Sequence, residues 1–524
     1  MRFPLRSKRP AKQEILSSDS WPAPVLGWNT RDSEANMPRG YALYMENWWP
    51  TAKNVQIRKG AMDHVTGKLP TEPVKTMLSW NGVSSSKMFA ATDTGLYDVT
   101  SAGTFGAVSQ ALTNGRVESV NFRTTGGSFL VCVNGTDDLV YYNGTSWASV
   151  ANFVIGAGPS TLLTKDIVNI HSFKRGLYFL KKDSLSFFYL PIDQILGTVS
   201  EYPLGAIFDK GGYLIAQGTW TVDGGKGVDD LTVFVSSEGQ LAVYQGTDPG
   251  SSSTWALVGV FDIARPIGKR CFCKFGGDLL YMSYLGCVGI SKFLQSTKID
   301  MKPSITDTIG QAFTEAASNY GNLYGWEFAV SPNENILLVN IPLNEYSNSV
   351  QYVMNTNTGA WTKFTGWDVY SWTLFGNTLY GGMAGKVGKF WQDANGDFGN
   401  LIQCYVKQAP AYLNPRARMK QTRMLQPIFR ISGRVAVDAA IDNDFSDHDD
   451  YGQATFTTVP NSRFDISTWD TAVWGVVAIN KVDWLTVADQ MGYAKALRLR
   501  VLASDATVEW SATNVLYETG ALQG

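Results

Sequence analysis

The stretch LVYYNGTSW at residues 139–147 combines a short apolar strand, a polar Asn-Gly turn and a tryptophan. Residues 241–255, LAVYQGTDPGSSSTW, follow the same plan, and so do residues 350–364, VQYVMNTNTGAWTKF. In each copy an aromatic residue or a methionine ends the strand before the turn. Similar turn chemistry before each tryptophan indicates an internal structural repeat.

The spacing of the three tryptophans sets the size of the repeating unit. Trp255 lies 108 residues after Trp147, and Trp361 lies 106 residues after Trp255. Because a propeller blade takes roughly 40–50 residues, each interval accommodates two blades with their loops. Weaker copies of the plan start at Gly95, Gly176, Asp278 and Gly385. Together the copies predict an all-β fold with a β-propeller of about seven blades over residues 74–398.

Short alternating strands separated by Gly, Asn and Asp turns fill the same region, as a propeller requires. The predicted strands are residues 87–91, 129–133, 139–142, 176–180, 231–235, 241–244, 279–283, 336–341 and 350–354. One helix is predicted among them, over residues 305–317. Thr306 or Asp307 would cap this helix. Ile309 and Phe313 would lie on its buried face.

The pattern of strands and turns changes after about residue 400. Strands are predicted at residues 433–441, 496–502 and 507–511. We expect them to form a separate β-sandwich-like domain that a strand at residues 55–58 joins, because chain ends often lie near each other. The predicted organisation is a basic, flexible tail (1–26), an N-terminal arm with a helix and a strand that joins the C-terminal domain (27–73), the propeller (74–398) and the C-terminal β domain (399–524).

The composition bounds the class of protein. The 524 residues carry a formal net charge of −2, which is not the balance of a protein that grips nucleic acid, although it suits one that lets nucleic acid slide past. Aromatic residues make up 13%, which favours wide sheets or large subunit interfaces. The five cysteines include no C-x-x-C pair, so buried free thiols made in a reducing cytosol are expected. No run of 18 apolar residues predicts a transmembrane helix.

Two segments resemble ligand loops without meeting their requirements. Residues 442–450 supply oxygen atoms at alternate positions, but Asp447 and Gln453 stand where a calcium loop needs Gly and Glu, which favours a solvated acidic loop. Residues 223–227 lack the spacing of a phosphate loop and are interpreted as a hairpin turn. Three scattered histidines give no support for a nucleophile–base pair. We therefore expect no enzyme activity, no cofactor and no metal.

A basic cluster precedes the C-terminal strands. It consists of Arg416, Arg418, Lys420, Arg423 and Arg430. One interpretation is a solvated or intersubunit face that pairs with acidic neighbours; the other is a strip along which DNA phosphates pass. The first is favoured, since basic runs usually serve protein surfaces unless the whole domain is basic.

The start of the chain carries a resemblance to a known family. Residues 27–67 include GWNTRDSEANMPRGYALYMENWWP, followed by VQIRKG. Pro38 would open a helix with Tyr41, Met45 and Trp48 on one face, and residues 55–58 would form a strand. This segment resembles the opening of tail proteins from short-tailed bacteriophages, the nozzle or tail-tubular-B-like group. The resemblance covers about forty residues closely, and the rest of the chain agrees in architecture.

The resemblance implies a structural role in a virion. Such proteins form a ring, usually a hexamer, that lies below the portal and adaptor, continues the channel for double-stranded DNA without sequence-specific binding, and carries tail fibres or spikes. By this analogy we expect synthesis in the host cytoplasm and interface contacts from Trp48, Trp49, Arg416, Arg418 and Arg423. The alternatives are a carbohydrate-binding or glycan-cleaving propeller, with aromatic residues stacked on sugars and converging carboxylates, and a cellular interaction scaffold.

Overall fold

The computed structural model describes residues 16–67, 72–223, 228–295, 304–393, 396–446, 456–458, 479–481 and 483–520. The described residues divide into two compact units. The propeller unit holds residues 29–31 and 58–402, and the terminal unit holds the described residues of 1–28, 32–57 and 403–524. Both units are built almost entirely of strands.

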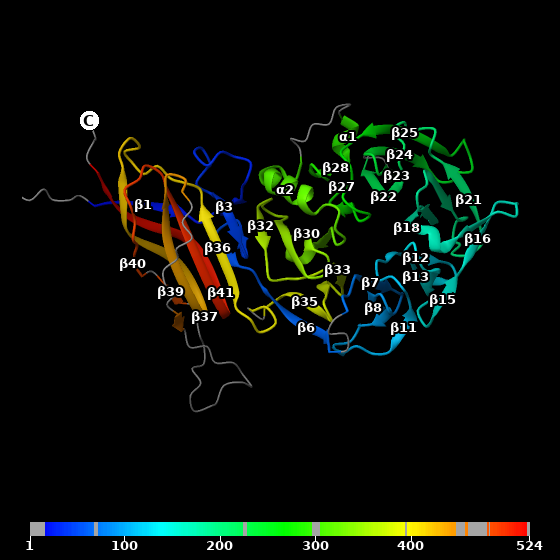
Figure 1. Ribbon diagram of the computed structural model, residues 1–524, viewed down its shortest axis with the longest axis horizontal. Helices are drawn as coiled ribbons and strands as arrows, with labels where there is room; N and C mark the ends of the chain where they lie inside the picture. Colours follow the sequence, from blue (N-terminus) through cyan, green and yellow to red (C-terminus); the bar gives the residue numbers. More distant parts are fainter. Residues whose placement is uncertain are drawn as a thin grey trace, which may run out of the picture. The chain divides into compact units, whose positions relative to one another are not determined.

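The propeller unit is a closed ring of seven sheets within its described residues (Figure 1). The first strand of every sheet lies beside the first strand of the next, and β33 lies beside β7, which closes the ring. These inner strands are β7 (Thr76–Asn81), β12 (Glu118–Thr124), β18 (Ile167–Phe173), β22 (Leu214–Asp223), β26 (Phe272–Phe275), β29 (Glu327–Ser331) and β33 (Ser371–Phe375). The predicted propeller of about seven blades is confirmed.

Each inner strand continues outward as an antiparallel meander. Blades 1 to 3 add β8 (Ser86–Thr92), β9 (Gly95–Asp98), β11 (Val108–Ala111), β13 (Gly127–Val133), β14 (Leu139–Tyr142), β15 (Trp147–Val150), β19 (Gly176–Lys181), β20 (Ser186–Tyr189) and β21 (Thr198–Pro203). Blades 4 to 7 add β23 (Val228–Ser236), β24 (Gln240–Gly246), β25 (Trp255–Asp262), β27 (Asp278–Ser283), β28 (Gly286–Gly289), β30 (Ile336–Asn344), β31 (Asn348–Asn355), β32 (Trp361–Phe364), β34 (Thr378–Met383) and β35 (Lys386–Gln392). All nine strands predicted in this region are confirmed.

The ring closes through a strand from the other end of the unit. β6 (Gly60–Thr66) pairs antiparallel with β35, so residues from both ends of the propeller share blade 7. A closed ring leaves only short, protected edges, and pairing the first strand with the last blade fastens it. The boundary predicted at residue 74 is therefore too late. The propeller unit begins at Arg58 and includes β6.

The three tryptophans of the repeat occupy equivalent positions. Trp147, Trp255 and Trp361 each form the first residue of the fourth strand in their blade, in blades 2, 4 and 6. Trp255 and Trp361 are buried, and Trp147 packs against the buried layer between blades 1 and 2. The predicted equivalence in alternate blades is confirmed, because each tryptophan folds the outer strand back after the same kind of turn.

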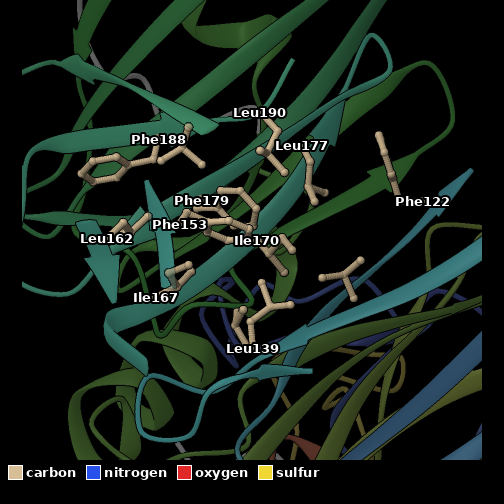
Figure 2. Packing of buried hydrophobic residues seen from close by; sticks show 13 residues of the cluster. Phe122, Leu139, Phe153, Leu162, Ile167, Ile170, Leu177, Phe179, Phe188 and Leu190 are labelled. Atoms are coloured by element: carbon tan, nitrogen blue, oxygen red, sulfur yellow. The ribbon is translucent and has the colours of Figure 1, made fainter. Parts of the chain in front are cut away.

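The core consists of layers between neighbouring blades. Figure 2 shows the layer between blades 2 and 3, with Phe153, Phe179 and Ile170 near its middle. The Phe153 and Phe179 ring centroids are 5.3 Å apart. Burying each such side chain stabilises the fold by about 1.5–3 kcal/mol, so facing blades hold each other in place. β16 (Asn152–Ile155) supplies Phe153 and, with β17 (Thr161–Leu163), extends the outer edge of blade 3.

The predicted helix is present between blades 5 and 6. η2 (Asp307–Ile309) leads into α2 (Gly310–Tyr320), and Ile309 and Phe313 are fully buried, as expected. The predicted cap is wrong, because neither helix end carries a side-chain cap bond. The Thr306 hydroxyl instead accepts the Cys287 amide at 3.1 Å. The remaining elements of the unit are η1 (Thr164–Asp166), β10 (Gly103–Thr104), α1 (Ser291–Gln295) and η3 (Pro332–Glu334).

Two long strands dominate the terminal unit. β37 (Lys420–Asn443) and β41 (Lys495–Thr519) pair antiparallel along nearly their whole length (Figure 1). The two strands predicted at 496–502 and 507–511 are thus parts of one strand. On its other side β41 pairs with β5 (Val55–Ile57), which confirms that the N-terminal strand joins this domain. The other strands are β1 (Ser17–Pro22), β2 (Gly27–Trp28), β3 (Tyr41–Glu46), β4 (Trp48–Pro50), β36 (Ile402–Gln408), β38 (Phe456–Thr458), β39 (Ile479–Lys481) and β40 (Leu485–Thr486).

The helix predicted after Pro38 is wrong, because this segment forms β3 and β4. β3 pairs antiparallel with β36, and a register shift between Ala42 and Tyr44 adds one residue to the strand. The extra residue lets Ala42 and Met45, three apart, both be fully buried, which imitates helical spacing. Asn47 has φ of 60°, a left-handed conformation that separates β3 from β4.

The flexible tail predicted over residues 1–26 is wrong for its described part. β1 pairs antiparallel with β41, from Ser17 opposite Tyr517 to Pro22 opposite Ala512. Trp21 is 3% exposed, so an apolar anchor fixes this strand in the sheet. The basic residues 1–12 lie outside the described residues.

Candidate functional site

One arginine ties the propeller together at one end of its central channel. Arg270 precedes β26, and its side chain is largely withdrawn from solvent. Its Nε donates to Glu118 Oε1 at 3.0 Å, and its Nη1 donates to Glu327 Oε2 at 2.6 Å. The guanidinium also lies over the Tyr324 ring, 5.4 Å from its centroid. Two carboxylates and one aromatic ring thus surround a single cation.

The remaining donors of Arg270 are also used. Nη1 donates to Ser371 Oγ at 3.2 Å, and Nη2 donates to Thr76 Oγ1 at 3.1 Å and to the Val117 carbonyl at 2.9 Å. All five guanidinium N–H groups therefore have an acceptor, which is the full capacity of this side chain. An arginine whose donors are all used in internal hydrogen bonds holds its neighbours in place and has no N–H group left for a ligand.

The acceptors come from equivalent positions in the fold. Thr76, Glu118, Glu327 and Ser371 are each the first residue of an inner strand. Since inner strands line the channel and start at the same end of it, their first side chains converge on the axis. Arg270 thereby connects blades 1, 2, 6 and 7 with its own blade 5. We call these five residues the Arg270 network.

A pocket of about 410 Å³ adjoins the Arg270 network. Its walls come from the segments that lead into the inner strands and from the β13–β14 turn. The lining residues are Asn114, Arg116, Glu118, Asn134, Tyr213, Ile215, Gly268, Lys269, Arg270, Gly321, Asn322, Leu323, Tyr324, Gly325 and Trp326. The pocket mixes three cations and one carboxylate with apolar and aromatic surface.

Two of the pocket cations keep unused donors. The Nε of Arg116 donates to the Tyr346 hydroxyl at 2.6 Å and its Nη2 to Glu345 at 2.9 Å, which leaves Nη1 without a partner among the described residues. Lys269 forms no ion pair with any carboxylate of the described residues. Removal from water lowers the pKa of Lys269, and nearby Arg270 and Arg116 lower it further against the opposing effect of Glu118.

One acidic member of the Arg270 network, Glu327, has a pKa shifted by burial. The pKa of Glu327 is raised by desolvation, although Arg270 and the Trp372 amide N–H oppose this shift. Glu327 accepts that N–H through Oε1. Both carboxylates that converge in the channel are thus occupied by fixed donors.

Desolvation of the His171 side chain, on another inner strand, should make the stability of the propeller depend on pH. It lies on β18, its Nε2 is 2.8 Å from Thr219 Oγ1 on β22, and desolvation, with a contribution from Lys274, lowers its pKa to about 4. The unfolded chain, with a histidine pKa near 6.5, binds more protons between these values. We expect the free energy of unfolding to be highest above pH 6.5 and to fall, by up to about 3 kcal/mol, as the pH drops to 4. Chemical denaturation of wild type and His171→Asn at several pH values measures it; parallel pH profiles would contradict it.

The tryptophans predicted at an interface do not lie at the surface. Trp48 is fully buried and Trp49 is 7% exposed. Trp48 packs against Trp510, with ring centroids 5.8 Å apart. Their burial within the chain removes them from direct contact with a partner. The interface contacts expected from Trp48 and Trp49 stay a prediction, which the burial of both side chains within the chain does not favour.

Some arginines of the basic cluster form ion pairs and others do not. Arg423 pairs with Glu518 at 2.6 Å, and Arg430 lies 3.9 Å from Glu509, both acidic residues on the neighbouring strand β41. Arg416 is exposed and lies over Tyr412, 4.2 Å from the ring centroid. Arg418 is half-buried. The interpretation with acidic neighbours describes Arg423 and Arg430, whereas Arg416 and Arg418 form no ion pair with a carboxylate of the described residues.

The acidic loop begins in an ion-paired strand. Asp442, in β37, lies 2.9 Å from Arg498 and 3.3 Å from Lys407, so cations of its own sheet occupy it. Residues 447–450 lie outside the described residues, as do residues 224–227 of the predicted hairpin, which β22 and β23 flank. In the described part of the chain no group of His, Cys, Asp or Glu is arranged to hold a metal ion. No described helix is long and apolar enough to cross a membrane.

Sequence reasoning missed the Arg270 network and the pocket. The five network residues are scattered from Thr76 to Ser371, and no common sequence motif surrounds them. A signal exists only after the blades are aligned, when a polar residue recurs at the first position of several inner strands. The tryptophan repeat could have supplied that alignment, although it marks the outer strands.

Comparisons with known proteins found similar solved structures at low identity. No family model and no curated protein matches the chain. Three similar solved structures are BBS1N in complex with ARL6DN, the Swd1 β-propeller domain of Myceliophteria thermophila, and Sqt1 of Saccharomyces cerevisiae. Their identities are 10%, 11% and 15%, and their TM-scores are 0.36, 0.40 and 0.37. The alignments cover 64%, 63% and 67% of this chain and 96%, 99% and 86% of those chains. The likeness concerns the propeller fold alone.

Proposed function

We propose that this chain is a structural subunit of the tail nozzle of a short-tailed bacteriophage. In this role six copies form a ring below the portal and adaptor, double-stranded DNA passes through the lumen without sequence-specific binding, and tail fibres or spikes attach outside. The chain has no catalytic role in the proposal.

One observation carries the proposal. Most of the segment that resembles phage nozzle proteins, residues 27–67, supplies strands β3, β4 and β5 to the terminal unit, beside the long strands β37 and β41. The terminal unit is assembled from both ends of the chain, and the propeller is inserted between them in the sequence. In the proposal, the terminal unit builds the ring and the propeller is an accessory domain. The resemblance therefore concerns a coherent structural domain rather than a loose arm.

The charge arrangement of the terminal unit supports a conduit. Neighbouring strands carry opposite charges, as in the Arg423–Glu518 pair and in the Arg500–Asp438 pair on the other half of β37. Cations that are already paired contribute little to phosphate binding, and a channel with few phosphate contacts lets DNA slide. The net charge of −2 agrees with this interpretation.

The glycan-cleaving alternative lacks a comparable observation. A glycosidase needs two carboxylates free to act as acid and as base or nucleophile. The carboxylates that converge in the propeller channel, Glu118 and Glu327, are both bound by Arg270. Their hydrogen bonds to Arg270 favour a structural role for both carboxylates.

Assembly of the purified protein tests the proposal. With its adaptor ring present, the chain of 57.5 kDa is expected to add about 345 kDa to the complex, since six copies bind. The free protein stays monomeric in this scheme until the adaptor templates it. Mass photometry of the mixture measures the added mass.

Exposed Arg416 and half-buried Arg418 of the basic cluster provide a matched pair of variants for that measurement. Arg416→Glu with Arg418→Glu should lower ring formation at least 10-fold, because like charges replace intersubunit attraction. Arg123→Glu with Lys165→Glu reverses two exposed charges on the propeller and should leave assembly unchanged. Equal assembly by both double variants would contradict the placement of the interface.

A further inference from the structure

The pocket beside the Arg270 network contains cationic hydrogen-bond donors that have no acceptor among the described residues. Arg116 Nη1 and the Lys269 ammonium lack partners among the described residues, as shown above. Both side chains line the same cavity. The third cation, Arg270, has all its donors saturated and only contributes its charge. Up to five N–H groups, two from Arg116 and three from Lys269, are thus available to acceptors in the cavity.

Several cations and one carboxylate act on Lys269, and Glu118 is the largest single charge effect among them. Arg270, Arg116 and Lys182 all disfavour its protonated form, and only Glu118 favours it. Glu118 is itself bound by Arg270 at 3.0 Å, which offsets its charge. The Lys269 side chain is exposed, and three like charges act on its ammonium from within and around the pocket. An anion beside it would relieve the repulsion between the cations.

The cavity has the size and surface of a small-molecule site. Its volume of about 410 Å³ lies within the usual range of roughly 300–1,000 Å³ for ligand pockets. Ile215 and Leu323 supply apolar walls, and Tyr213 and Tyr324 supply aromatic ones. Tyr324 is fixed by Thr76, whose Oγ1 is 3.0 Å from its hydroxyl. A few placed charges on a mainly fixed wall are typical of sites that orient one charged group.

We infer that this pocket binds a small molecule through an oxyanion, a carboxylate or a phosphate group, held by Lys269 and by Nη1 of Arg116. The body of the ligand lies against Ile215, Leu323 and the tyrosine rings. The site is independent of the proposed nozzle function, because it requires only the folded propeller unit. Occupation would fasten the segments before β12 and β26 to each other and so strengthen the closed ring.

Calorimetric titration of the full chain with inorganic phosphate and, separately, with citrate tests the inference. At pH 7 and low salt we expect dissociation constants in the millimolar range or tighter for at least one of them, and the stronger of the two identifies the group. Lys269→Met should weaken that binding about 10-fold or more, the effect of one charge-assisted hydrogen bond. Lys165→Met removes an exposed lysine outside the pocket and should bind as wild type. Unchanged melting temperatures would show that both variants fold.

The pH dependence of anion affinity shows whether the Lys269 ammonium itself holds the anion. Glu118, Arg270, Arg116 and Lys182 are the charged groups that act on Lys269. Because its pKa is lowered, affinity should decline as the pH rises through that pKa, and Lys269→Arg should bind with little pH dependence. Absence of binding by wild type to both anions at about 20 mM, or equal binding by Lys269→Met, would overturn the inference.

Discussion

Arg270→Met is expected to lower the free energy of unfolding of the propeller by about 3–5 kcal/mol, the largest effect of any single substitution proposed for this unit. The substitution leaves Glu118 and Glu327 in the channel without their cation. A buried carboxylate that loses its partner pays the full cost of desolvation, and three further acceptors lose their donor. Chemical denaturation followed by tryptophan fluorescence measures the loss.

Two control variants show whether the loss of stability is specific to the Arg270 network. Arg265→Met removes an exposed arginine that pairs with Glu238, and it should change stability by at most about 1 kcal/mol. The triple variant Arg270→Met, Glu118→Gln, Glu327→Gln removes the stranded charges and should recover part of the loss. Equal stability of the Arg270 and Arg265 variants would show that the ring does not depend on this network.

The Arg270 variant should also acquire a pH dependence. Burial already raises the pKa of Glu327, and loss of Arg270, which opposes that shift, would raise it further. A carboxyl group with a raised folded pKa stabilises the fold below its unfolded pKa, near 4.5, and loses that contribution as the pH rises. The deficit relative to wild type is therefore expected to be larger at pH 8 than at pH 5.

Trp48→Ala is expected to destabilise the terminal unit by about 3–5 kcal/mol, the cost of deleting a large buried aromatic side chain. Trp48 is fully buried between strands of this unit and contacts Trp510, which packs in turn on Phe429. The large cavity would lie where β4, β5 and β41 meet. Thermal denaturation with hydrogen exchange, which reports the two units separately, measures the loss.

An exposed tryptophan of the same unit supplies the control. Trp484 is 41% exposed, and Trp484→Ala should change stability by less than about 1 kcal/mol. Trp48→Phe should cost less than Trp48→Ala, since the Trp48 indole N–H has no hydrogen-bond partner among the described residues. A folded, fully stable Trp48→Ala protein that fails to assemble would instead restore Trp48 to an interface.

The propeller could be predicted because its signal is local. Each repeat places a strand, a turn and a tryptophan within about fifteen residues, and the fourth strand of blades 2, 4 and 6 begins at that tryptophan. The closure of the ring could not be predicted in the same way. β6 pairs with β35 more than 300 residues later, and nothing in GAMDHVT identifies that partner.

The failures at the N-terminus have a common physical cause. The helix prediction rested on the spacing of Tyr41, Met45 and Trp48, but these residues lie in β3 and β4, and Tyr41 is only half-buried there. The candidate site failed for a different reason. Its residues converge only through the rotation of the blades about one axis, so Arg270 carries no motif that distinguishes it from other arginines.

Electron cryomicroscopy of tails purified from virions that carry this chain tests the central claim most directly. We expect six copies in a closed ring around a lumen that admits double-stranded DNA, with the terminal unit lining that lumen. Density for the ring should be lost from particles assembled without the chain. A tail that lacks this chain, or one in which the propeller itself encloses the DNA path, would contradict the account.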